Sequence, residues 1–201
     1  MVYNKVLEYS KVFKHQIDGE RSKSILELRS ALMHEEWVET LIACSKGDLV
    51  EVIDGLADMV YVIVGAKIAF GLPVGYSNLH IDMSIAETVQ DQFPLKNDSF
   101  KHQLVLVGTY FQNYDLNIVE GNLIDASENL DNALIVIQKL SSMLGVDIRD
   151  AVDVVHDSNM SKLGEDGQPI FNEKGKNLKG PDYVAPTGGL VELVCRRKES
   201  K

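Results

Sequence analysis

Six carboxylates in two short stretches form the most chemically suggestive feature of the sequence. MHEEWVET, residues 33–40, holds three glutamates within five positions, and no Lys or Arg lies three or four residues from any of them. EVIDGLAD, residues 51–58, adds three carboxylates at i, i+3 and i+7. Like charges at helical spacing each cost a few tenths of a kcal/mol, so a compensating cation is expected. The six residues are Glu35, Glu36, Glu39, Glu51, Asp54 and Asp58.

The two stretches are expected on neighbouring antiparallel helices. At about 100° per residue, the glutamates span an arc of about 100° on one helix and the second set about 60° on the next. The short turn SKGD joins them, so the helices should pack antiparallel and bring both acidic stripes together. Hard divalent cations suit such oxygen ligands. Mg²⁺ suits them best because it combines one or two carboxylates with waters and substrate phosphates, and Mn²⁺ is the expected substitute.

Ordinary surface charge, iron and zinc account less well for the acidic stretches. Any one of these residues alone is best explained as an exposed carboxylate, but apolar neighbours around both stretches predict substantially buried helices. A di-iron bundle needs Glu-x-x-His pairs, and no Glu here has His three residues on. A zinc site is not expected, because the sequence lacks clusters of Cys and His. Cys44 and Cys195 are interpreted as reduced thiols of a cytoplasmic protein.

Composition bounds the class of protein. The chain has 201 residues, a formal charge of −10 and 45% hydrophobic residues, which predicts one domain or two small ones with a buried core. An acidic chain is a poor candidate for holding a nucleic-acid backbone. No run of 18 apolar residues exists, and the N-terminal stretch MVYNKVLEYSK lacks the apolar region of a secretory signal. We therefore expect a cytoplasmic protein without nucleic-acid or membrane partners.

Apolar periodicity predicts an all-α fold with an irregular tail. The helices are predicted at 3–17, 23–46, 48–71, 78–92, 99–116, 121–144 and 147–161. Residues 1–162 are interpreted as an all-α catalytic domain with a four-helix-bundle-type core. Residues 163–201 are a glycine-rich tail, predicted as a β-hairpin with turns at EDG and EKG that packs on the domain, and the final LVCRRKESK is expected to fray.

The helical part contains an internal repeat at a constant offset of 74 residues. GDLVEVIDGLADMVYVIVGAKIAFGLPV, from Gly47, aligns without a gap on GNLIDASENLDNALIVIQKLSSMLGVDI, from Gly121. Matching turn glycines and acidic positions favour a tandem duplication, with repeat one at about 29–84 and repeat two at about 103–161, over two helix pairs that share only an amphipathic pattern. The offset replaces Glu35, Glu36, Glu39 and Asp58 with Thr109, Tyr110, Asn113 and Asn132.

These motifs resemble the all-α nucleoside triphosphate pyrophosphohydrolases, the MazG-like superfamily. The family pattern Glu-Glu-x-x-Glu, then Glu-x-x-Asp before an apolar run, is matched by EEWVE and EVIDGLADMVYV. DGLADMVYVIVGAKIAFG (54–71) and VHDSNMSKLGEDGQPIFNEKGKNLKGPDY (155–183) resemble a branch with phosphoribosyl-ATP-pyrophosphatase-like and phage-encoded members. Together the motifs cover roughly half of the chain.

The chain departs from the family pattern in two places. The position three residues before Asp58 is Gly55, so the Glu-x-x-Asp pair is either Glu51 with Asp54, or Asp54 substitutes for the missing glutamate. In addition, 83 residues (72–154) separate the two motifs that short members of the family join almost directly. The family usually dimerises through such helix pairs. We therefore expect a homo-oligomer, a dimer or tetramer, in which the second repeat acts as a pseudo-partner.

The resemblance implies Mg²⁺-dependent hydrolysis of a (deoxy)nucleoside triphosphate to the monophosphate and pyrophosphate. It implies metal binding by Glu36, Glu39 and the second acidic stripe, of which Glu51, Asp54 and Asp58 stay equal candidates. Glu35 or Glu36 is the expected general base. The expected substrate-binding residues are Trp37, Asn159, Lys162, Lys174, Lys176 and Lys179.

Several of these assignments have alternatives. The lysines of the tail are as readily explained as solvated side chains of a structural hairpin, and His156 is interpreted as a structural hydrogen-bonding residue. Phe13 and Gln16 are further candidates, with Trp37, for a base pocket. The rival functions are a phosphoribosyl-ATP pyrophosphatase and a non-catalytic helical scaffold.

Overall fold

The computed structural model describes residues 2–73, 96–173 and 177–199 and is all-helical within them. The predicted helix 78–92 lies outside the described residues. No helix in the described ranges is both long and apolar enough to span a bilayer. The helices are α1 Val2–Val12, α2 Lys23–Lys46, α3 Leu49–Phe70, α4 Asp98–Glu120, α5 Leu123–Met143, α6 Ile148–Met160 and α7 Thr187–Glu199.

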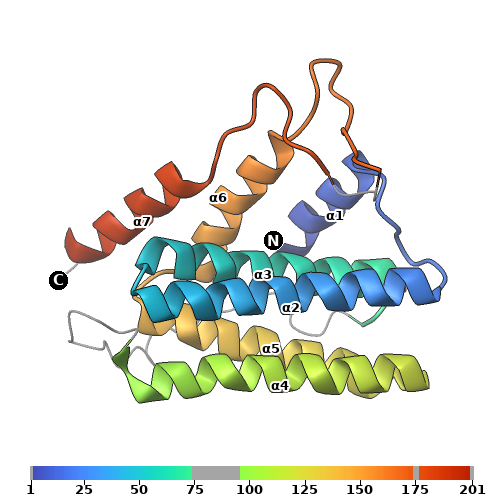
Figure 1. The fold of residues 1–201 in the computed structure, drawn as a ribbon, viewed down its shortest axis with the longest axis horizontal. Helices are drawn as coiled ribbons and strands as arrows, with labels where there is room; N and C mark the ends of the chain where they lie inside the picture. The colour runs from blue at the N-terminus through green and yellow to red at the C-terminus, as the bar shows by residue number, and fades with distance from the viewer. Residues whose placement is uncertain (1, 74–95, 174–176, 200–201) are drawn as a thin grey trace.

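Two helical hairpins, α2–α3 and α4–α5, pack on each other (Figure 1). α2 contacts α4, and α3 contacts α5. On its other side α3 carries α1, α6 and α7, so it is the central helix and almost all of it is buried. The first hairpin is therefore covered on both sides, whereas α4–α5 forms one outer layer of the fold (Figure 1).

The two hairpins begin and end at equivalent positions. Adding 74 to the bounds of α2 and α3 gives 97–120 and 123–144, and the observed bounds of α4 and α5 are 98–120 and 123–143. Gly47 and Gly121 end the first helix of each hairpin with φ of 74° and 80°, in the left-handed region that favours glycine. Asp48 and Asn122 then cap the second helix by accepting a backbone N–H three residues on. These local signals fix where each hairpin turns.

Side chains of α2 hold the first hairpin against the second. The Trp37 indole N–H donates to the Leu104 carbonyl oxygen at 2.8 Å, and a Cβ at Gly108 would overlap the indole ring. His34 lies 2.8 Å from Asp115. His34 contacts Asp115, whereas Trp37, later in α2, contacts Leu104 and Gly108, which come earlier in α4. The two helices are therefore antiparallel, as two copies related by a twofold axis would be.

Three boundaries predicted from the sequence need correction. α1 ends at Val12, not at 17, because the chain turns at Lys14, with φ 56°, and Asp18 and Gly19 then donate to the last carbonyls of α3. In the described part of the tail, isolated antiparallel bridges join Leu163 to Pro169 and Phe171 to Asn177, in place of the continuous strands of the predicted hairpin. Residues 193–199, within the stretch predicted to fray, belong to α7, and Leu190 of this helix is fully buried in the core.

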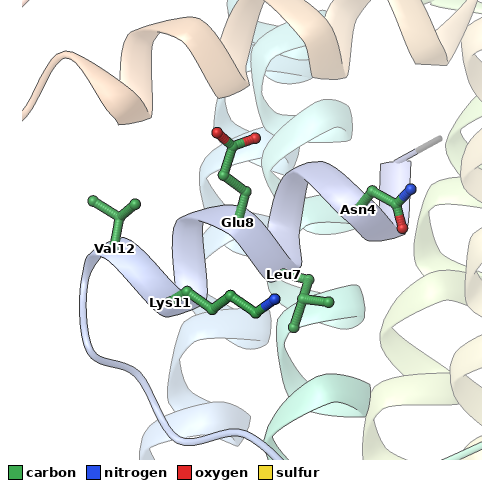
Figure 2. A pocket seen from close by; sticks show the side chains of 5 residues that line it. All are labelled: Asn4, Leu7, Glu8, Lys11 and Val12. Atoms are coloured by element: carbon green, nitrogen blue, oxygen red, sulfur yellow. The ribbon is translucent and has the colours of Figure 1, made fainter.

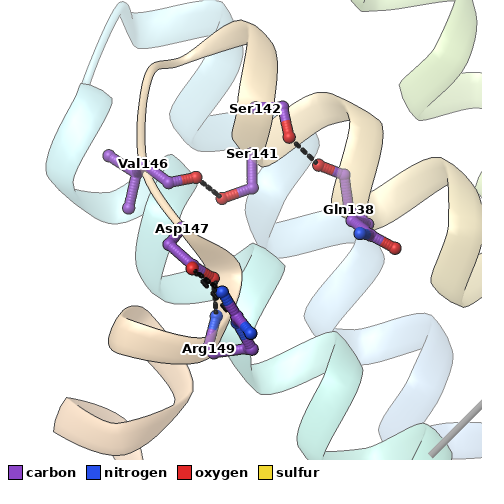
Figure 3. A network of polar contacts seen from close by, with 6 residues as sticks. All are labelled: Gln138, Ser141, Ser142, Val146, Asp147 and Arg149. Carbon is purple, nitrogen blue, oxygen red and sulfur yellow. Dashed lines mark hydrogen bonds and ion pairs between the residues drawn. The ribbon is translucent and has the colours of Figure 1, made fainter. Parts of the chain in front are cut away.

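Polar contacts set the turn from α5 to α6 (Figure 3). Ser141 donates its hydroxyl to the Val146 carbonyl oxygen at 2.7 Å, and Ser142 donates to the Gln138 carbonyl. Asp147 caps α6 by accepting the Arg149 backbone N–H at 2.8 Å, and the Arg149 guanidinium also donates to this carboxylate. The turn directs α6 back across α3, which places the end of α6 near the acidic residues of the first hairpin.

Candidate active site on the first helical hairpin

The acidic residues of α2 and α3 lie within electrostatic reach of one another. Glu36 faces Asp58 across the hairpin, and Asp54 lies one turn from Asp58 on α3. Glu39 influences all three of these carboxylates. Lys162, just beyond α6, also acts on all three, with the opposite sign. The antiparallel hairpin thus brings the two stripes together, and α6 adds one cation.

Burial and crowding raise the pKa of the inner carboxyls. Burial, then the charges of Glu39, Glu35 and Asp54, raise the pKa of Glu36 to about 7. Burial and then Glu51 raise the pKa of Asp54 to about 6, against Lys162. Burial and then Glu36 raise the pKa of Asp58 well above its ordinary value. These carboxyls hold protons more tightly than exposed ones, so their charged forms are poorly compensated within the described part of the chain.

The donor set suits a hard divalent cation. Glu36, Asp54 and Asp58, which are half-buried, and Glu39, which is exposed, offer only oxygen, which Mg²⁺ and Mn²⁺ prefer. Asp54 Oδ1 is buried and has no hydrogen-bond partner among the described residues, so one oxygen lacks a ligand that a cation would supply. In the described residues no three carboxylate, His or Cys side chains lie close enough to hold an ion as they stand. Binding would therefore require these side chains to draw together.

The end of α6 and the start of the tail hold Lys162 in place. Lys162 Nζ donates to the Asn159 amide oxygen, and Asn159 is itself buried. The next anchor is Ser161, whose hydroxyl accepts the Val184 backbone N–H at 2.9 Å. The motif SNMSK therefore presents its lysine to the carboxylates through contacts with both α6 and the tail.

The remaining predicted site residues lie in varied places. Glu35 and Glu51 are exposed at the edge of the cluster, where each acts on one inner carboxylate. Trp37 points into the contact with α4, and this position gives no support to a role in a base pocket. Lys179 lies 4.3 Å from the centre of the Tyr183 ring, within the tail. The predicted contacts of Lys174 and Lys176 lie outside the described residues.

Two further base-pocket candidates have structural contacts. Phe13 is fully buried and stacks on Tyr9 at 4.2 Å between ring centres. The Gln16 amide donates to the carbonyl oxygens of Glu20 and Ala69, which secures the segment after α1 to the end of α3. Both residues therefore help to fix the chain beside the site.

Sequence reasoning missed a polar and aromatic group beside the carboxylates. Tyr61 of α3 bonds to His156 Nδ1 of α6 at 3.0 Å, so His156 has the structural hydrogen bond predicted for it. Tyr9 of α1 packs edge-on against Tyr61, and the charge of Asp58 contributes to raising the pKa of both phenols. The spacing of Tyr61 from Asp58, one helical turn, is the only sequence signal for this group.

A separate shallow hollow lies on the outward face of α1. Figure 2 shows its lining, Asn4, Leu7, Glu8, Lys11 and Val12, with Glu8 directed toward α6. The Glu8 carboxylate lies 3.7 Å from His156 Nε2. None of the six predicted carboxylates lines this hollow, so the chemistry is better sought at the hairpin than here.

Comparison with known protein families gives a match over the first part of the chain. Residues 6–76 match the family of phosphoribosyl-ATP pyrophosphohydrolases. That family is part of the MazG-like superfamily of all-α nucleoside triphosphate pyrophosphohydrolases, which the sequence motifs resemble. The matched pyrophosphohydrolase segment contains most of α1 and the whole of α2 and α3, with all six carboxylates, and it ends before the second hairpin.

The chain is also similar to an uncharacterized protein of Acanthamoeba polyphaga mimivirus. The two are 29% identical over 187 residues, which cover 86% of this chain and 73% of the viral protein. The similarity therefore extends well beyond the pyrophosphohydrolase segment. No solved structure matches the chain.

Proposed function

We propose that this protein hydrolyses a (deoxy)nucleoside triphosphate to the monophosphate and pyrophosphate, with Mg²⁺ as cofactor. The observation that carries the proposal is the placement of Glu36, Asp54 and Asp58 together, beside Lys162, within the segment that matches a pyrophosphohydrolase family. A cluster that is electrostatically unfavourable alone becomes favourable when a cation and a polyphosphate are added. The role would be cleansing or remodelling of a nucleotide pool.

Glu36, Glu39, Asp54 and Asp58 are the residues that would hold the metal. Among the three candidates on α3, Asp54 and Asp58 are favoured because they are partly buried and interact electrostatically with Glu36. Glu51 is exposed in the first turn of α3, and among the three inner carboxyls its charge raises the pKa of Asp54 alone. It is therefore the least favoured of the three candidate metal ligands on α3. When bound, Mg²⁺ supplies positive charge to the phosphates and acidifies water.

The carboxylates also supply a general base. Water attacks the α-phosphorus, a new P–O bond forms, and the bond from this phosphorus to the bridging oxygen breaks so that pyrophosphate leaves. Glu36 is proposed to accept the proton of the attacking water. Burial and neighbouring charges raise its pKa to about 7 in the metal-free protein, and a bound cation would oppose that rise. Glu35, the neighbouring alternative, is exposed and acts on Glu36 as a nearby negative charge.

Lys162 is the proposed contact for the leaving pyrophosphate. Its ammonium is the cation that most consistently opposes the charge of the inner carboxylates, and Asn159 orients it. A negatively charged phosphate oxygen would complete its hydrogen bonds. Lys179 and the tail around it are proposed to close over the triphosphate.

The second hairpin is proposed as a built-in pseudo-partner. α4–α5 packs on α2–α3 in antiparallel fashion, has equivalent bounds and lacks the glutamates. Trp37 fills the contact at Gly108. The arrangement supports a tandem duplication in which one copy retains chemistry and the other provides packing. A homodimer of the chain would then hold two sites and four hairpins.

The test is a panel of ribo- and deoxynucleoside triphosphates with Mg²⁺ or Mn²⁺, scored for pyrophosphate and monophosphate. Phosphoribosyl-ATP belongs in the panel, since the matched family carries that name. The expected result is metal-dependent release of pyrophosphate, lost in Glu36→Gln and Asp58→Asn. Absence of turnover with every compound, together with unchanged divalent-metal binding in Glu36→Ala, would favour the scaffold alternative.

A further inference from the structure

Lys162 is anchored by one neutral side chain. Its ammonium donates to the Asn159 amide oxygen, and within the described residues this is the only hydrogen bond or ion pair of the ammonium. An ammonium has three hydrogens, so two are left for a ligand. The direction in which Lys162 presents those two hydrogens therefore depends on how the Asn159 amide is held.

Asn159 lies between Lys162 and His156 along one ridge of α6. The three residues are spaced by three positions, and the Lys162 backbone N–H donates to the Asn159 carbonyl oxygen at 3.2 Å, so the helical turn continues past the end of α6. Tyr61 of α3 meets this ridge. Its hydroxyl lies 3.0 Å from His156 Nδ1 and also forms a side-chain hydrogen bond with Asn159. The four side chains thus form one continuous chain of hydrogen bonds.

The donors and acceptors fix the direction of each hydrogen bond. Lysine has only donors, so the oxygen of the Asn159 amide faces Lys162, and the NH₂ group of the amide donates to Tyr61. The Tyr61 hydroxyl accepts this bond, so its own hydrogen goes to His156 Nδ1. Burial raises the pKa of Tyr61 and lowers that of His156, so the phenol keeps its hydrogen and the imidazole keeps a free acceptor.

The chain of hydrogen bonds points toward a carboxylate at the surface. With Nδ1 of His156 as an acceptor, the neutral ring carries its hydrogen on Nε2. The Glu8 carboxylate, in the hollow shown in Figure 2, lies 3.7 Å from Nε2 and favours the hydrogen on that atom. The negative end of the chain is therefore Glu8 and the positive end is Lys162. Every bond between them runs in the direction that these two charges favour.

A reversed Asn159 amide would turn its NH₂ group toward Lys162. Both groups would then be donors, and the lysine would lose its anchor. Because Asn159 is 8% exposed, water has little access to compensate for such a mismatch. The Tyr61 hydroxyl opposes the reversal, since it offers an acceptor to the NH₂ group and gives its hydrogen to His156.

We propose that Tyr61 and His156 are positioning residues, which hold the amide between them and Lys162 so that the ammonium presents its two remaining hydrogens to the substrate phosphates. Neither residue touches the substrate. The inference rests on the proposed function for its ligand. It differs from a purely structural role of the pair because the effect on the ligand passes through Lys162 alone.

Binding of inorganic pyrophosphate with Mg²⁺, measured by calorimetry, tests the proposal without turnover. Lys162→Gln should weaken binding about 10- to 100-fold, because a charge-assisted hydrogen bond is lost. Tyr61→Phe should weaken binding about 3- to 10-fold when Lys162 is present, and less than about 2-fold in the Lys162→Gln background. Tyr114→Phe is the matched control and should leave binding unchanged. It also removes a buried hydroxyl, but one on α4 that has no hydrogen-bond partner among the described residues.

His156 supplies a second pair of variants and a readout that needs no ligand. His156→Leu removes the acceptor and should reproduce the effect of Tyr61→Phe. His156→Asn keeps an acceptor bonded to Cγ, as Nδ1 is, and should retain most of the binding. NMR of the ring nitrogens in the wild type should show the hydrogen on Nε2, as the direction of the chain requires.

The outcomes separate the positioning role from the proposed reaction. Equal weakening by Tyr61→Phe with and without Lys162 would show a structural hydroxyl and overturn the proposal, as would a hydrogen on His156 Nδ1. If the wild type binds no pyrophosphate, the phosphate contact and the positioning role both fall. Coupled binding of pyrophosphate in a protein that hydrolyses no triphosphate would uphold the positioning role and remove the reaction. Hydrolysis with no coupling between Tyr61 and Lys162 would do the reverse.

Discussion

Lys67 of α3 is joined to Asp131 of α5 by an ion pair of 2.6 Å in the interior of the protein. The lysine side chain is 1% exposed, and its ammonium also donates to Ser127 Oγ and the Pro73 carbonyl oxygen. All three hydrogens of the ammonium are therefore used. The pair crosses from the first hairpin to the second, so it connects the acidic half of the fold to the half that lacks the glutamates.

Breaking this pair should strongly destabilise the fold. Asp131→Asn or Lys67→Met is expected to lower the free energy of unfolding by about 3–5 kcal/mol, because either change leaves a buried partner uncompensated. Urea denaturation followed by circular dichroism measures it. Lys101→Met is the control, since its pair with Asp98 is exposed and 3.7 Å long, and it should change stability by less than about 1 kcal/mol. Equal effects of the interior and surface changes would contradict the connecting role.

The contact between Trp37 and Gly108 gives a prediction about packing of the hairpins. Gly108→Ala should destabilise the protein by about 1–3 kcal/mol, because the new Cβ overlaps the indole, although alanine is the better helix former by about 1 kcal/mol. Gly188→Ala in α7 is the matched control: nothing lies within 4 Å of the added Cβ, so helix propensity should dominate. Thermal unfolding of both variants decides this. If the two glycines respond alike, the hairpins do not meet as described.

The carboxylate cluster gives a pH dependence of stability. Folding raises the pKa of Glu36 to about 7 and that of Asp54 to about 6, so the folded state binds protons more tightly than the unfolded state. The stabilising protonation is complete below the unfolded pKa values, near 4, and is lost as the pH rises through 6 and 7. In EDTA, the unfolding temperature should therefore fall between pH 5 and pH 8.

Binding of a divalent metal, or removal of one carboxylate charge, should reverse the fall in unfolding temperature. Mg²⁺ should raise the unfolding temperature more at pH 8 than at pH 5, because ligand carboxylates must be ionised. Glu36→Gln should stabilise the EDTA-treated protein at pH 8 by about 1–3 kcal/mol, at about 1.4 kcal/mol for each pKa unit, while abolishing activity. Glu165→Gln, a change of an exposed tail residue, is the control. A flat pH profile in EDTA would mean that the inner carboxylates are not crowded.

Lys162 gives a prediction about activity. Lys162→Gln should lower kcat/KM for triphosphates by about 10- to 100-fold, because it removes the one cation that faces the inner carboxylates from the end of α6 and with it a charge-assisted hydrogen bond to phosphate. It should also raise the apparent pKa on the rising limb of the pH–rate profile, because Lys162 lowers the pKa of Glu36. Lys179→Gln is the comparison, as that lysine packs on Tyr183. Similar rates for wild type and Lys162→Gln would remove Lys162 from the site.

The sequence by itself determined the two acidic hairpin helices and their ends. It predicts helix 23–46 with its observed bounds, and 48–71 to within one residue at each end, because periodicity and the caps at Gly47 and Asp48 are local signals. The antiparallel turn then requires Glu36 and Asp58 to lie near each other. The acidic half of the candidate site follows from residues fewer than 25 positions apart.

Only the tertiary structure decided what surrounds that site. The end of α1, the direction of Trp37 and the bond from Tyr61 to His156 all depend on residues that are distant in sequence. Such contacts depend on how helices pack and which faces they bury, which no local pattern encodes. For the same reason α7 was not predicted. Its sequence is mostly polar, and it is ordered as a helix because Leu190 is buried in the core.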